Sequence, residues 1–98
     1  MNVDTKVFIG LEAVRRSGIT NMFDINTVQV AANRLGFFDA VIWLNDNSGQ
    51  YAKGIMEGID PVTPLTPAQE LEIDRAAQAL TATIEAERTQ NGPILWKK

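Results

Sequence analysis

The chain of 98 residues contains no cysteine and no histidine. Without cysteine it forms no disulfide, offers no thiolate ligand to a metal and has no thiol nucleophile. Without histidine it lacks the commonest general base and the commonest zinc ligand of proteins. These two absences exclude most enzyme mechanisms. We therefore expect a protein that is not an enzyme, with no catalytic residues, no metal site and no cofactor.

A strong charge of either sign is also missing. Asp plus Glu is 12 and Lys plus Arg is 9, which gives a net charge of −3, and the isoelectric point is about 4.8. Domains that bind nucleic acid usually carry a basic surface and a much higher isoelectric point. We therefore expect no nucleic-acid partner.

Long hydrophobic runs are absent as well. No apolar run approaches the roughly 18 residues of a transmembrane helix. The apolar stretch near the N-terminus contains Asp4 and Glu12, which is untypical of a signal peptide. We expect a cytosolic protein that makes no contact with membranes, and the length fits a single domain.

Helix signals dominate the first 60 residues, whereas strand signals are almost absent. Asp4 is a good N-cap and Gly18 a good C-terminal cap for a first helix. Asp24 or Asn26 can cap the next helix, and Ser48 can cap the fourth. Apolar residues recur at helical spacing between these signals. The pattern predicts four short helices, over residues 5–17, 25–35, 37–46 and 49–58.

A proline-containing linker over residues 61–65 separates these helices from a long one. Thr66 and Gln69 have the spacing of a capping box, and Pro67 occupies the favoured first helical position. We expect the helix to run from residue 67 to about 89, because Gly92 and Pro93 are stop signals. The sequence thus predicts an all-α single domain, made of a four-helix unit (residues 1–60), the linker and a C-terminal part (66–98).

The long helix carries an apolar seam at Ile73, Ala77, Leu80 and Ile84, with successive spacings of four, three and four. This spacing suits packing against the first four helices or against another chain. An apolar tail follows the predicted helix end, and it can dock on its own chain or on a neighbour. We favour a homo-oligomer whose contacts use Leu71, Ile73, Ala77, Leu80, Ile84, Ile94, Leu95 and Trp96.

A set of arginines, amides and aromatic residues forms the candidate binding group for a ligand or partner. Arginine and aromatic side chains are typical interface anchors, and aromatic rings can stack on nucleotide bases. The alternative is a solvated face with a few cations near helix ends. The candidates are Arg15, Arg16, Asn21, Arg34, Trp43 and Tyr51. Among the acids, Glu70 and Asp74 share a helix face, and we interpret them as solvated rather than metal-binding.

Residues 7–59 resemble a family of small domains of uncharacterised function that occurs mainly in phages and prophages. The most specific part reads Arg-Ser-Gly-x-Thr-Asn-Met-Phe-Asp and ends at Asp24. The resemblance implies a phage setting and transfers no activity or site residues. It is carried by residues 10–18, 20–24, 35–37, 51–52 and Gly58.

Two classes of function remain open. The first is a non-catalytic phage accessory protein that binds and neutralises a host component, either a defence protein or a small nucleotide signal. The second is a DNA-associated phage protein in packaging or regulation, or a component of the virion or its assembly. A helix-turn-helix through Gly36 and Phe37 would place residues 38–45 as the recognition helix. That segment has no Lys or Arg, which counts against DNA binding.

Overall fold

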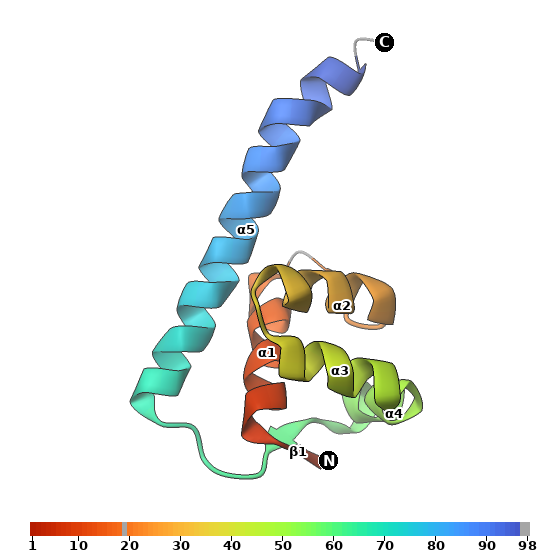
Figure 1. Cartoon of the computed structure of the whole chain (residues 1–98), viewed down its shortest axis with the longest axis vertical. Coiled ribbons are helices and arrows are strands. Elements are labelled where there is room, and N and C mark those ends of the chain that lie inside the picture. The colour runs from red at the N-terminus through yellow and green to blue at the C-terminus, as the bar shows by residue number, and fades with distance from the viewer. Residues whose placement is uncertain (19, 97–98) are drawn as a thin grey trace.

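The computed structural model describes the backbone of residues 1–18 and 20–96 and the side chains of residues 1–18 and 20–82. Within these ranges the chain is mostly helical, as predicted, with one pair of very short strands (Figure 1). The elements are β1 (Asn2–Val3), α1 (Thr5–Ser17), α2 (Ile25–Arg34), α3 (Phe38–Asp46), α4 (Ser48–Glu57), β2 (Asp60–Pro61) and α5 (Pro67–Trp96).

Helix α1 is the central element, because it contacts α2, α3 and α5. Its side chains Val7, Leu11 and Val14 are buried in the larger apolar cluster of the chain. Ile9 and Ala13 point to a second cluster that includes Ile73 of α5. The helix is therefore covered by packed side chains on two faces.

The predicted caps of the first two helices are present. Asp4 accepts a hydrogen bond from the backbone N–H of Lys6 at 2.9 Å, and Asp24 accepts one from the N–H of Thr27 at 3.3 Å. Gly18 ends α1 in the left-handed region with φ 70°. A side chain at φ near 70° would clash with its own backbone, which is why glycine suits this position.

Ser48 does not cap α4, and this prediction was wrong. Ser48 is the first residue of α4, and Asn47 stands at the cap position without a side-chain capping bond. Asn47 also ends α3, and its side-chain amide donates to the carbonyl of Trp43 at 3.1 Å. The two helices follow each other so closely that the polar side chain between them serves the end of α3.

The strands β1 and β2 form a parallel pair that the sequence did not predict. Asn2 lies opposite Asp60 and Val3 opposite Pro61. The N-terminal amine also donates to the carbonyl of Gly58 at 2.9 Å. Strands of two residues are too short to show an alternating pattern, and their partner lies far along the chain. This pair ties the N-terminus to the segment that follows α4.

Helix α5 begins as predicted and ends later than predicted. Thr66 and Gln69 form the reciprocal bonds of the capping box, at 2.9 and 3.1 Å. The predicted end near residue 89 was wrong, since the helix continues through Gly92 and Pro93 to Trp96. Glycine and proline cost a helix about 1 and 3 kcal/mol respectively, so they weaken a helix without forbidding it.

The second half of α5 extends beyond the other helices (Figure 1). The segment expected to be a tail, residues 94–96, therefore belongs to a projecting helix. In the described part of the chain, no helix is both long and apolar enough to cross a membrane.

Candidate functional site

A nearly buried carboxylate on α1 organises the polar centre of the molecule. The side chain of Glu12 is 10% exposed and accepts hydrogen bonds from two arginines of the same helix. Arg15 Nε donates to Glu12 Oε1 at 2.7 Å, and Arg15 Nη2 donates to Oε2. Arg16 Nε donates to Oε2 at 2.8 Å. Residues three and four apart on a helix are neighbours, so the sequence spacing itself brings the three side chains together.

The two arginines set the ionisation of Glu12. Burial raises the pKa of this carboxyl, but the hydrogen bonds and positive charges of Arg15 and Arg16 lower the pKa by more. The net pKa lies below the ordinary value of 4.5. Glu12 is therefore a carboxylate at neutral pH, and it is no candidate for a general acid.

Arg16 joins α1 to α5. Its Nη1 donates to Asp74 Oδ1 at 2.9 Å, and its Nη2 donates to Glu70 Oε1 at 3.1 Å. Glu70 and Asp74 do share a helix face, as the spacing predicts, and a cation lies between them. Arg16 is thus engaged with three carboxylates of its own chain. It holds the long helix in place and has little capacity left for an external anion.

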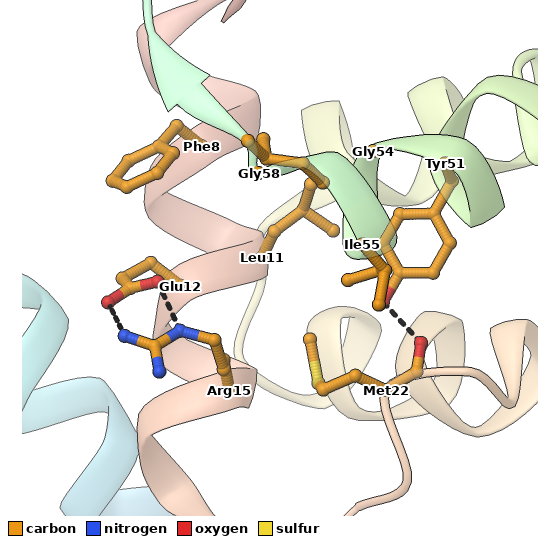
Figure 2. A pocket seen from close by; sticks show the side chains of 10 residues that line it. Phe8, Leu11, Glu12, Arg15, Met22, Tyr51, Gly54, Ile55 and Gly58 are labelled. Carbon is orange, nitrogen blue, oxygen red and sulfur yellow. Dashed lines mark hydrogen bonds and ion pairs between the residues drawn. The ribbon is translucent and has the colours of Figure 1, made fainter. Parts of the chain in front are cut away.

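A cavity of about 360 Å³ opens beside Glu12, between α1, α4 and the turn before α2 (Figure 2). One end carries the ion pair of Glu12 and Arg15, and the remainder is apolar. The apolar side chains of the lining are Phe8, Leu11, Met22, Tyr51, Ile55 and Ile59, with Gly54 and Gly58 completing the wall. This volume falls in the range of sites for small molecules.

Tyr51 forms part of the cavity wall but is not free to stack on a ligand. It is fully buried, and its hydroxyl donates to the carbonyl of Met22 at 2.5 Å (Figure 2). Burial raises the pKa of Tyr51 to about 12. Trp43 packs edge-on against Tyr51, with ring centroids 6.3 Å apart. These two aromatic residues stabilise the core from α3 and α4.

The six predicted binding residues do not form one site. Arg15 and Tyr51 both line the cavity, whereas Arg16 points to α5. Asn21 accepts a hydrogen bond from the N–H of Phe23 at 3.0 Å and so shapes the turn before α2. Arg34 lies at an exposed position in the last turn of α2. The three predicted arginines are thus not gathered at one place.

The predicted oligomer contacts divide into three groups. Ile73, Ala77 and Leu80 are buried, on the helix that packs against α1 of the same chain, so the seam is used within the chain. Leu71 is 50% exposed and remains accessible. The side chains of Ile84, Ile94, Leu95 and Trp96 lie outside the described residues.

Sequence reasoning missed several residues of the cavity. Glu12 was not among the predicted site residues, although its spacing to Arg15 and Arg16 signals the ion pairs. Phe8 and Ile55 fit the apolar helix faces and gave no separate signal. Their partial exposure depends on how α1 and α4 diverge, which the sequence pattern does not contain.

A second surface lies between α2 and α3, where a shallow groove carries exposed apolar side chains. Val30 on α2 is 58% exposed and Ile42 on α3 is 60% exposed. Phe38, one turn before Ile42, is 58% exposed. The groove is lined by Gln29, Val30, Asn33, Val41, Ile42 and Asn45. None of these six side chains carries a charge.

The described residues contain no group of three or more acidic side chains placed to hold a metal ion. Glu12, the one nearly buried carboxylate in the described part of the chain, is paired with arginines.

Residues 3–59 match a family model described as "Domain of unknown function (DUF5049)". The matched region contains α1 to α4 and Val3 of β1, and it excludes β2 and α5. No curated protein and no solved structure matches the chain. The function must therefore be inferred from the site itself.

Proposed function

Because the chain belongs to the DUF5049 family of domains of unknown function, we propose its function from its surfaces. We propose that it is a non-catalytic phage accessory protein that works in the host cytosol. It acts as a homo-oligomer that binds a host protein, such as a defence protein, and neutralises it by occupying its surface.

The observation that carries this proposal is the uncharged groove between α2 and α3, referred to below as the α2–α3 groove. Val30 and Ile42 form its exposed apolar centre, and neutral amides flank them. The exposure of several large apolar side chains in one surface patch is unfavourable in water, and such patches often mark interaction sites. The centres of protein interfaces are depleted in charged residues. The groove therefore suits a protein partner with a complementary apolar ridge.

The charge distribution argues against the other two classes of target. A nucleotide signal needs several cations around its phosphates, whereas Arg16 is occupied by Glu12, Glu70 and Asp74. DNA binding through α3 would need basic side chains on that helix. The exposed residues of α3 are apolar, amide or acidic.

The projecting half of α5 supports the homo-oligomer. An α-helix rises 1.5 Å per residue, so α5, with 30 residues, is more than twice as long as α1, with 13. Helix α1 covers its first half. The second half contains Ile84, Ile94, Leu95 and Trp96 in the sequence, which makes it suitable for pairing with another copy.

The proposal can be tested by photo-crosslinking in bacterial cells. A photoreactive phenylalanine analogue replaces Ile42 in the α2–α3 groove in one variant. In the control variant it replaces Met56, which is 80% exposed on α4 and outside the groove. We expect the Ile42 variant to yield a crosslink to one host protein that mass spectrometry identifies, and the Met56 variant to lack that product.

Either of two results would contradict the proposal. One is equal crosslinking of the host protein from both positions, which would indicate contact without a specific surface. The other is a product from Ile42 that contains only the protein itself, which would make the α2–α3 groove an assembly contact.

A further inference from the structure

The cavity beside Glu12 is independent of the α2–α3 groove, since the two linings share no residue. Its walls come from α1, α4 and the turn that holds Met22 (Figure 2). Phe8, Met22, Ile55 and Ile59 are each partly exposed there. Water filling such a space finds few polar partners, because the Tyr51 hydroxyl already donates to Met22. An apolar group that displaces this water is favoured.

The single charged end of the cavity determines which polar group a ligand can carry. The Glu12 carboxylate accepts hydrogen bonds from both arginines, so its charge is compensated within the chain. The side chain of Arg15 is 59% exposed. Its hydrogen bonds to Glu12 use Nε and one Nη2 hydrogen, whereas a guanidinium has five N–H groups. Arg15 therefore keeps donors for one further acceptor at the mouth of the cavity.

We propose that this cavity binds a small monocarboxylate with an apolar, preferably aromatic, body. The body lies between Phe8 and Ile55, and the carboxylate accepts hydrogen bonds from Arg15. A carboxylate matches the planar fork of arginine in two parallel bonds. Arg15 is already paired with Glu12, so it offers free N–H donors to one carboxylate and cannot neutralise the several phosphate charges of a nucleotide.

The probe for this proposal is cinnamate, a rigid aromatic carboxylate, and its neutral counterpart is cinnamamide, which has the same shape. The full chain carries labelled methyl groups at Ile55 and Met22, and both compounds are titrated while NMR shifts are recorded. We expect cinnamate to shift both methyl signals with a Kd of about 1 mM or tighter. Cinnamamide should bind about tenfold more weakly, because an ionic hydrogen bond is lost.

Two pairs of variants locate the site. Ile55→Trp fills the cavity and should abolish binding, whereas Met56→Trp, on the same helix but outside the cavity, should keep it. Arg15→Gln should make the acid and the amide bind equally. Arg75→Gln, which removes an exposed arginine of α5 outside the cavity, should preserve the difference. Thermal melting of each variant establishes that it is folded.

The proposal is overturned if cinnamate leaves both methyl signals unchanged at about 10 mM, which is ten times the expected upper limit of the Kd. It is also overturned if wild-type protein binds the acid and the amide equally. That second result would identify the cavity as a receptor for an uncharged apolar group, such as a side chain of a protein partner. If Ile55→Trp fails to fold, the comparison of Arg15→Gln with Arg75→Gln still decides between these outcomes.

Discussion

Glu12 shows how one polar residue within an apolar helix can order its surroundings. A carboxylate that is 10% exposed is stable only where donors replace its lost water. Arg15 and Arg16 supply these donors from the next turn, and Arg16 extends the contact to α5. The same residue therefore stabilises α1, fixes the long helix and sets the charge at the mouth of the cavity.

Glu12 should make stability depend on pH in the acidic range. Its folded-state pKa lies below the ordinary value of 4.5, so its contribution is fully present above that value and is lost as pH falls through the folded pKa. Glu12→Gln should lower the free energy of unfolding at neutral pH by about 1–2 kcal/mol. The loss stays below that of a fully buried pair because Arg15 is 59% exposed and solvent screens it.

Urea denaturation of wild-type protein and Glu12→Gln at several pH values between neutral and acidic measures this effect. The two free energies should converge as the pH falls below the ordinary carboxyl value. A constant difference across the whole range would show that Glu12 acts through packing and not through its charge.

Gly10 marks a close approach between α1 and the start of α3. A Cβ at this position would lie 2.7 Å from the Cβ of Ala40 and 2.9 Å from the Cβ of Phe37. Gly10→Ala should therefore lower the free energy of unfolding by about 1–3 kcal/mol through overcrowding, despite the better helix propensity of alanine. Gly49→Ala is the matched control, because nothing lies within 4 Å of its Cβ.

Chemical denaturation of both glycine variants checks this prediction. The control should be neutral or slightly stabilised. Equal stability of the two variants would mean that α1 and α3 can separate at no cost.

At the scale of elements, the features that were predicted best from the sequence are those whose signals lie within a few residues of one another. The caps at Asp4 and Gly18 and the capping box at Thr66 each depend on residues within four positions of one another. The β1–β2 pair was missed because its strands have two residues each and lie far apart in the sequence.

The surfaces were harder to predict than the helices. The cavity and the α2–α3 groove depend on how far helices diverge, and apolar periodicity shows only which face of a helix is apolar. Val30 and Ile42 fit a core pattern as well as a surface pattern. The distinction follows from the tertiary arrangement, which leaves them more than half exposed.

We expect the core to fold without the projecting half of α5. Ile73, Ala77 and Leu80 precede residue 82 and are buried, so a chain that ends after Ala82 should stay folded. We expect this shortened chain to be a monomer and the full chain, of 10.8 kDa per subunit, to be an oligomer. Light scattering coupled to size-exclusion chromatography measures both masses.

Circular dichroism of the shortened chain serves as the control for folding. An oligomer that survives the truncation would place the contact on the first helices. A full chain that is already monomeric would remove the oligomer from the proposal.

At the scale of the whole molecule, two uncharged or nearly uncharged surfaces are carried by a mildly acidic domain. The net charge of −3 disfavours contact with nucleic acid, and the two arginines in the last turn of α1 are engaged with carboxylates. Specific recognition then depends on apolar contact and shape. This is the basis for the central claim that the protein acts by binding a host protein through the α2–α3 groove.

Native mass spectrometry of the protein purified from host cytosol tests that claim most directly, with wild type and Ile42→Asp compared side by side. We predict that the wild type carries a host protein in a defined stoichiometry, and that Ile42→Asp, although folded, has lost it. The claim would be contradicted if the wild type has the mass of its own subunits alone, or if Ile42→Asp keeps the host protein.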